Sequence, residues 1–109
     1  MLFRSVELFK NTVNFKEQIR YRISGDEKQI SLAVSACQKA LKNTNITIDD
    51  IDYIVSASAV SIQPIPCMAA LIHEKIAKGT SIPALDINTT CTSFITALDT
   101  MSYLLETGR

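Results

Sequence analysis

Cys91 is the residue of this 109-residue chain that is best placed for chemistry. It follows a short apolar segment with strand character, residues 84–88, and a long apolar helical pattern begins directly after it. This order places the thiol on a tight strand-to-helix turn, at or near a helix N-terminus. Unpaired N–H groups and the helix dipole there favour thiolate over thiol, and the thiolate is the nucleophile. The pattern therefore predicts a cysteine nucleophile.

The other two cysteines and the single histidine offer weaker chemistry. Cysteine is among the most often buried residue types, so packing in the core is the alternative role for any of them, Cys91 included. Cys37 lies on the apolar stripe of a predicted helix and is expected in the core. Cys67 follows Pro66 in a predicted first helical turn, where packing is favoured and mild reactivity is left open. Without a CxxC pair or a ligand beside His73, we expect neither a disulfide framework nor a metal site.

The amino-acid composition and charge exclude several classes of protein. The chain is 47% hydrophobic, which is enough for the core of one small domain. Eleven basic residues balance eleven acidic ones, so no net field attracts nucleic acid or an anionic membrane. No apolar stretch reaches the roughly 20 residues that span a bilayer, and the first residues do not form a secretory signal. We expect a cytoplasmic protein that binds neither nucleic acid nor membrane.

The elements around Cys91 follow from hydrophobic periodicity. The predicted order is a helix over residues 27–42 with Asp26 as N-cap, a strand over 53–57, a helix that starts near Pro64 and Pro66 and stops at Gly79, a strand over 84–88, and a helix through about Glu106. This α-β-α-β-α order implies a parallel sheet with crossover helices. Residues 19–23 alternate apolar and cationic side chains as a strand would, residues 6–9 fit either a strand or one helical turn, and no core strand is found before Phe15.

The last helix presents apolar residues around much of its circumference, so it should be buried between layers. Only two strands are strongly predicted, which leaves sheet edges and helix faces bare. We therefore expect that the chain pairs extensively with other chains or is part of something longer.

Residues 86–94, DINTTCTSF, resemble the nucleophile segment of thiolase-fold condensing enzymes, in particular the 3-oxoacyl-[acyl-carrier-protein] synthase III group. In that group a strand ending in Asp-Ile-Asn is followed by Ala-Ala-Cys-Ser-Gly-Phe. Residues 19–22 look like the family's Gly-Ile-Arg-Glu-Arg stretch, residues 49–55 match its acidic lead-in to a core strand, and residues 65–70 resemble its proline-containing helix start. The resemblance covers residues 19–109. Ser93 stands where the family usually has Gly, Thr90 where Ala is common, and Gln18 where an earlier Gly is usual.

The resemblance implies an α/β, thiolase-like fold, N-terminal half only, whose sheet has parallel core strands and a buried helix after the nucleophile. Residues 1–109 would be an incomplete N-terminal domain with the C-terminal half absent. The family's catalytic His and Asn come from that second half, and His73 does not match the family's histidine. We therefore expect that the isolated chain does not catalyse condensation. A side chain at Ser93 is expected to narrow the acyl pocket.

The resemblance also implies a reaction. Cys91 would take an acyl group from acyl-CoA, and malonyl carrier protein would then condense with it to a 3-oxoacyl product, as in fatty acid biosynthesis. The expected partners are acyl-CoA as substrate, with no separate cofactor, an acyl carrier protein, and a second subunit in a homodimer. Lys16, Arg20 and Arg22 would contact a CoA phosphate; ordinary solvated charges are the alternative for all three. Phe94 is expected to pack on its helix rather than on substrate.

Three other functions stay open at this point. One is another thiolase-fold synthase, either hydroxymethylglutaryl-CoA synthase-like or of polyketide type, which would share Cys91. The second is a non-catalytic remnant that acts only in assembly. The third is a cysteine hydrolase, which lacks a partner histidine in a suitable context.

Overall fold

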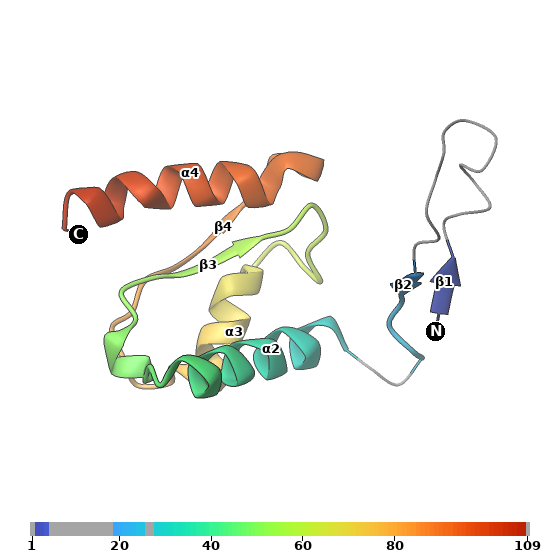
Figure 1. Ribbon diagram of the computed structural model, residues 1–109, viewed down its shortest axis with the longest axis horizontal. Coiled ribbons are helices and arrows are strands. Elements are labelled where there is room, and N and C mark those ends of the chain that lie inside the picture. The colour runs from blue at the N-terminus through green and yellow to red at the C-terminus, as the bar shows by residue number, and fades with distance from the viewer. Residues whose placement is uncertain (1, 5–18, 26–27, 109) are drawn as a thin grey trace.

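The computed structural model describes residues 2–4, 19–25 and 28–108, which form two separate parts (Figure 1). A short hairpin contains β1 and β2, and an α/β body contains the rest. The elements in chain order are β1 (Leu2–Arg4), β2 (Ile19–Tyr21), α2 (Gln29–Thr44), the 3-10 turn η1 (Ile48–Asp50), β3 (Ile54–Ala57), α3 (Met68–Ile76), β4 (Ala84–Ile87), the 3-10 turn η2 (Thr90–Thr92) and α4 (Ser93–Glu106).

The sheet of the α/β body consists of β3 and β4, which run parallel from the pair Ile54–Ala84 to the pair Ala57–Ile87. α3 packs on one face of this sheet with α2 outside it, and α4 lies across the other face (Figure 1). The predicted α-β-α-β-α order and the parallel pairing are therefore confirmed. The sheet puts the carboxyl ends of β3 and β4 at the same edge, and β4 leads from there to Cys91.

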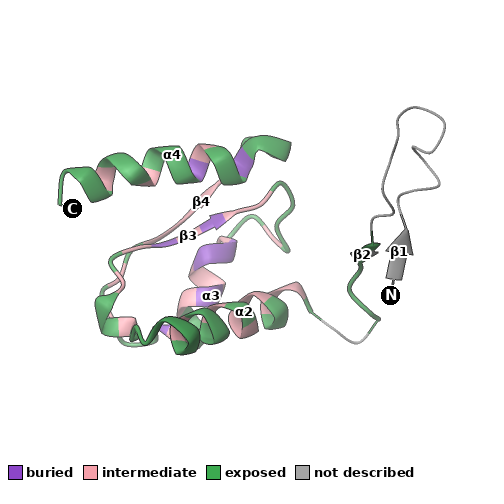
Figure 2. Ribbon diagram, in the orientation of Figure 1, coloured by how far each residue is buried: buried purple, intermediate pink, exposed green. Residues whose placement is uncertain are grey.

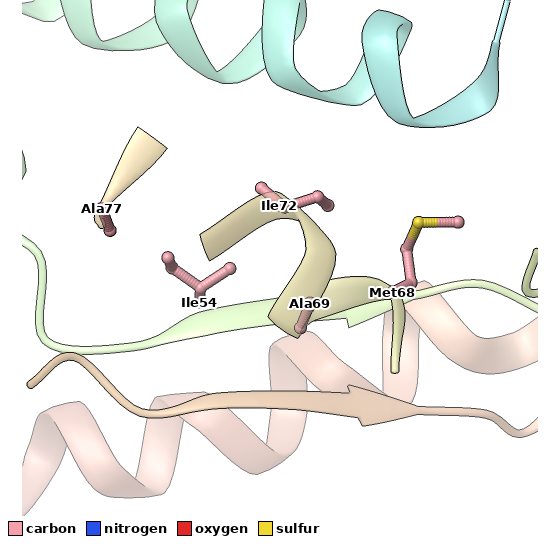
Figure 3. Packing of buried hydrophobic residues seen from close by; sticks show 5 residues of the cluster. All are labelled: Ile54, Met68, Ala69, Ile72 and Ala77. Carbon is pink, nitrogen blue, oxygen red and sulfur yellow. The ribbon is translucent and has the colours of Figure 1, made fainter. Parts of the chain in front are cut away.

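The core lies between the sheet and α3. Its buried members are contributed by β3, by α3 and by the residue that ends α3; they are Ile54, Met68, Ala69, Ile72 and Ala77 (Figure 3). Along β3, Ile54 and Ser56 are buried on this face, as the period of two in a strand requires. Cys37 and Ile30 of α2 pack against the cluster from outside. Cys37, expected in the core, is half-buried and lies at the edge of this cluster rather than within it.

Two predicted helix starts differ from the structure. The N-cap of α2 is Lys28, and the predicted cap, Asp26, lies outside the described residues. α3 begins at Met68 with Cys67 as its N-cap, so both prolines precede the helix rather than occupying its first turn. The reason is an acceptor that the sequence did not reveal: a carboxylate from β4 caps α3 at Met68, as described below.

The prediction that α4 would be buried between layers is wrong for the described residues. Only Ser93 and Ala97 of this helix are buried, and most of α4 is exposed in Figure 2. The exposed apolar side chains include Phe94 and Ile95, each 65% exposed, and Leu105, which is 73% exposed. The physical reason is that α4 contacts β3 and β4 on one side and no described element covers its other side. Phe94 does not pack on its helix as we expected.

The hairpin pairs β1 with β2 in antiparallel register, from Leu2–Tyr21 to Arg4–Ile19. β2 confirms the first three residues of the predicted strand over 19–23. β1 was missed, because three residues are too short for a periodic signal. The ambiguous segment at residues 6–9 and the family-based position Gln18 lie outside the described residues.

Candidate active site

Cys91 lies in η2, between the end of β4 at Ile87 and the start of α4 at Ser93. Its side chain is exposed and carries no disulfide. The predicted strand-to-helix turn is therefore present, and core packing, the alternative role for this cysteine, does not apply. The first turn of α4 has no acidic residue, so no carboxylate there neutralises the positive end of the helix dipole.

Asn88 anchors the loop that leads to the thiol. Its Oδ1 accepts a hydrogen bond from the N–H of Thr90 at 2.9 Å. Its Nδ2 donates to the carbonyl oxygen of Ala59 at 3.3 Å. Ala59 follows β3, so one amide side chain joins the loops beyond the two parallel strands.

Ser93 fixes the same loop from the other side. Its hydroxyl accepts a hydrogen bond from the N–H of Thr89 at 3.0 Å and donates to the carbonyl of Thr90 at 2.7 Å. The residue is only 3% exposed. The Ser93 side chain therefore connects the two sides of the turn that holds Cys91. The expected narrowing of an acyl pocket by Ser93 stays a prediction.

Thr90 has a left-handed backbone with φ of 55°. A β-branched residue is rarely found in this region, because its Cβ approaches the following carbonyl. Two hydrogen bonds hold this backbone in place: the N–H of Thr90 donates to Oδ1 of Asn88, and the hydroxyl of Ser93 donates to the carbonyl of Thr90. Strained residues of this kind gather at functional sites, and this one directly precedes Cys91.

The hydrogen bonds of this loop use the N–H groups of Thr89, Thr90 and Thr92. The N–H of Cys91 takes part in none of the hydrogen bonds found among the described residues. An exposed thiol and an unused N–H on the same residue can act together, the sulfur as nucleophile and the N–H as a donor to the oxyanion that forms.

Asp86 is a supporting residue that sequence reasoning did not assign. From β4 its two carboxylate oxygens accept the N–H groups of Met68 at 3.0 Å and Ala69 at 2.8 Å. These are orphan donors at the start of α3, where Cys67 provides no side-chain cap. The sequence did contain a signal for this role, because Asp86 is an acidic residue inside an apolar strand. Acidic residues are seldom buried without a partner.

Of the three predicted CoA-binding residues, the structure describes Arg20 and Arg22, and it does not place them beside the thiol. Lys16 lies outside the described residues. Arg20 lies in β2 and Arg22 is an exposed residue just after it. Figure 1 places this hairpin apart from the start of α4, so their role with CoA remains a prediction.

The remaining thiols and the histidine lie elsewhere. Cys37 and Cys67 are half-buried against the core. His73, near the end of α3, has its Nε2 3.3 Å from the hydroxyl of Thr80. Among residues 2–4, 19–25 and 28–108, no three His, Cys, Asp or Glu side chains gather as metal ligands would. No helix in this described part of the chain has the length and apolarity needed to cross a lipid bilayer.

Comparison with known proteins gives a consistent group of relatives, although no family model matches the chain. A beta-ketoacyl-[acyl-carrier-protein] synthase III from Neisseria gonorrhoeae is 30% identical over 84% of this chain and 28% of its own length. The enzyme of that name from Clostridium acetobutylicum is 33% identical over 95% of this chain and 31% of its own length. The chain thus spans under a third of the curated relatives it matches.

Solved structures give the same picture. The 3-oxoacyl-[acyl-carrier-protein] synthase III from Aquifex aeolicus superimposes with a TM-score of 0.77 at 27% identity, over 94% of this chain and 32% of that one. The corresponding enzyme from Xanthomonas oryzae, with a TM-score of 0.77 at 20% identity over 99% of this chain and 36% of its own, supports the fold alone. A tetronic acid condensing enzyme does so as well, with a TM-score of 0.67 at 23% identity over 72% of this chain and 24% of its own.

Proposed function

Since the chain is related over most of its length to beta-ketoacyl-[acyl-carrier-protein] synthase III, we propose that Cys91 is the acyl-accepting nucleophile of a condensing acyltransferase in fatty acid biosynthesis. The observation that carries this proposal is the exposed thiol between the end of a parallel strand and the start of a 14-residue helix. Nucleophiles placed on such turns are open to substrate while the backbone around them is fixed.

The first step is transfer of an acyl group to sulfur. The Cys91 thiolate attacks the thioester carbon of acyl-CoA, the new C–S bond forms, and the thiolate of CoA leaves. The tetrahedral intermediate carries negative charge on oxygen, which the unused N–H of Cys91 can receive. Asn88 and Ser93 keep that N–H in position, since both hold the backbone beside it.

The second step is condensation. Malonyl carrier protein loses CO2, and the resulting carbanion attacks the acyl carbon on Cys91. The C–S bond to Cys91 then breaks and releases a 3-oxoacyl product and the free thiolate. The developing enolate needs its own donors, and His73, at the far end of α3, does not supply one. We therefore assign this chain the acyl transfer to Cys91 and expect condensation to require groups that residues 1–109 do not contain.

The same proposal includes the partners. Acyl-CoA is the acyl donor, an acyl carrier protein delivers the malonyl group, and the active assembly is a cytoplasmic homodimer. Arg20 and Arg22, with Lys16, would contact a CoA phosphate. Arginine suits this role because its guanidinium binds phosphate through two hydrogen bonds.

Mass measurement of the intact chain after incubation with acetyl-CoA and longer acyl-CoAs tests the nucleophile. We expect one acyl adduct, lost in Cys91→Ser and retained in Cys67→Ser, the matched control. An adduct on Cys67 with Cys91 unmodified would refute the assignment. Turnover of acyl-CoA and malonyl carrier protein by residues 1–109 alone would show that the assignment of condensation to other groups is wrong.

A second candidate is a non-catalytic chain that acts in assembly. The exposed apolar side of α4, with Phe94, Ile95 and Leu105, favours it, because apolar side chains that are left exposed together promote association. Self-association without any acyl adduct would support this candidate over the enzyme. Another thiolase-fold synthase, of hydroxymethylglutaryl-CoA synthase or polyketide type, would give the same adduct with a different acyl preference.

A further inference from the structure

Thr92, the residue after Cys91, binds back to Thr89 through both its side chain and its backbone. Its hydroxyl donates to the carbonyl of Thr89 at 2.7 Å, and its N–H donates to the same oxygen at 3.2 Å. The hydroxyl also contacts Oγ1 of Thr89 at 3.1 Å. The Thr89 hydroxyl in turn donates to Oγ1 of Thr96, in the first turn of α4, at 2.9 Å. Thr92 and Thr96 therefore fasten Thr89 to the start of α4.

Two consecutive peptide units precede Cys91, and each is held at its carbonyl. The carbonyl of the Thr89–Thr90 unit accepts from the hydroxyl and the N–H of Thr92. The carbonyl of the Thr90–Cys91 unit accepts from the hydroxyl of Ser93, at 2.7 Å, and from the N–H of the same residue. Two neighbouring hydroxyls thus hold two neighbouring peptide units.

The backbone of Thr90 is the joint between these two units. Its φ of 55° sets their relative orientation, in a region that is unfavourable for a β-branched residue. Such a conformation persists only where the surrounding structure fixes it. The hydroxyl of Thr90 donates to the carbonyl just before it at 2.7 Å, and Oδ1 of Asn88 accepts its N–H at 2.9 Å, but both contacts stay within the loop. Thr92 supplies the side-chain contact that ties the first unit to the start of α4.

The orientation of the second unit decides where the N–H of Cys91 points. In a trans peptide unit the carbonyl and the N–H point in opposite directions. The carbonyl of Thr90 points to Ser93, so the N–H of Cys91 points out of the turn. A rotation at Thr90 would redirect this N–H. Stabilisation of an oxyanion depends on the direction of its donor, whereas attack of sulfur on an alkyl halide forms no oxyanion.

We propose that Thr92 is a positioning residue for acyl transfer: its hydroxyl keeps Thr90 in the left-handed conformation and so aims the N–H of Cys91 at the oxyanion of the intermediate. This inference rests on the proposed function of Cys91 as the acyl-accepting nucleophile. Thr92 acts through the backbone of Thr89 and Thr90 and needs no contact with the acyl group.

The test compares two reactions of Cys91 in the 109-residue chain, acylation by acetyl-CoA and alkylation by iodoacetamide, each followed by mass measurement. Thr92→Val removes the hydroxyl and keeps the shape of the side chain. We expect acylation to slow about fivefold, the change that one hydrogen bond produces, and alkylation to change by less than about twofold. Thr92→Ser keeps the hydroxyl and should acylate at the rate of the unmodified chain. Thr100→Val, at an exposed position of α4, is the matched control and should alter neither rate.

Equal slowing of both reactions in Thr92→Val would overturn the proposal, because the hydroxyl would then control access to the thiol. Unchanged acylation in Thr92→Val would overturn it as well. The absence of any acyl adduct on Cys91 in the unmodified chain would refute the proposed function and, with it, this role of Thr92.

A second measurement follows the backbone of Thr90 directly and does not depend on acylation. A strong nuclear Overhauser effect between the amide proton and Hα of Thr90 reports its left-handed conformation. This signal should persist in Thr92→Ser and weaken in Thr92→Val. Its full retention in Thr92→Val would overturn the proposal even where Cys91 is acylated, since Thr92 would then not fix Thr90.

Discussion

The carboxylate of Asp86 accepts the backbone N–H of Met68 at 3.0 Å, although the two residues are 18 positions apart. This contact joins β4, the strand that leads to Cys91, to the first residue of α3. The other carboxylate oxygen accepts the N–H of Ala69 at 2.8 Å. One side chain therefore sets the start of a helix and the position of the strand that carries the candidate nucleophile.

Replacing Asp86 with Ala should destabilise the chain by about 1–3 kcal/mol, because two N–H groups at the start of α3 lose their acceptors. Denaturation by urea measures this loss. The stability of Asp86→Asn should lie between that of the unmodified chain and that of Asp86→Ala, since the amide keeps one oxygen that can accept a hydrogen bond. Asp99→Ala, on the exposed side of α4, is the matched control and should change little. Equal midpoints for Asp86→Ala and Asp99→Ala would contradict this role.

Replacing Ser93 with Ala should loosen the turn that holds Cys91. The N–H of Thr89 loses its acceptor in a part-buried position, which costs about 1–3 kcal/mol of local stability. Amide hydrogen exchange at Thr89 and Thr90 should accelerate accordingly. Ser102→Ala removes a hydroxyl that bonds only to a carbonyl of its own helix, so it should leave both amides unaffected. Unchanged exchange in Ser93→Ala would show that the Ser93 side chain does not hold the turn.

Local patterns in the sequence predicted the strand-to-helix turn at Cys91, the parallel order of strands and the apolar face of α3. Each of these depends on periodicity over neighbouring residues, which a sequence displays directly. The cap on α3 depends instead on Asp86, which is far away in sequence, so the prolines were misread as part of the helix. The backbone strain at Thr90 had no signal either, because Thr is uncommon in the left-handed region.

The burial of α4 was mispredicted for a different reason. An apolar pattern reports that a helix face is suited to burial, and says nothing about which element covers it. Within the described residues only one side of α4 meets the sheet, so Phe94 and Leu105 stay exposed. The CoA-binding role of Arg20 and Arg22 came from the family alone, and the hairpin that contains them stands away from Cys91.

Replacing Thr90 with Gly should stabilise the chain, although glycine usually lowers stability because ordering it costs more backbone entropy. The left-handed backbone at this position costs a non-glycine residue about 1–2 kcal/mol, which exceeds the entropy lost by ordering Gly, about 0.5–1 kcal/mol. Thr100→Gly, inside α4, is the matched control and should destabilise by a few tenths of a kcal/mol. The two variants are compared by thermal unfolding. A fall in midpoint for both would mean that Thr90 is not strained.

The three thiols should react in the order of their exposure. Cys91 is exposed, whereas Cys37 and Cys67 are half-buried against the core, so an uncharged alkylating reagent should modify Cys91 roughly tenfold faster than either. Mass analysis of proteolytic fragments identifies the modified residue, and Cys91→Ser should remove the fast phase while Cys67→Ser leaves it intact. Denaturant should bring the three rates together, since it removes the difference in exposure. Fast modification of Cys67 in the native chain would contradict the placement of Cys91 as the accessible thiol and would shift the candidate site to the start of α3.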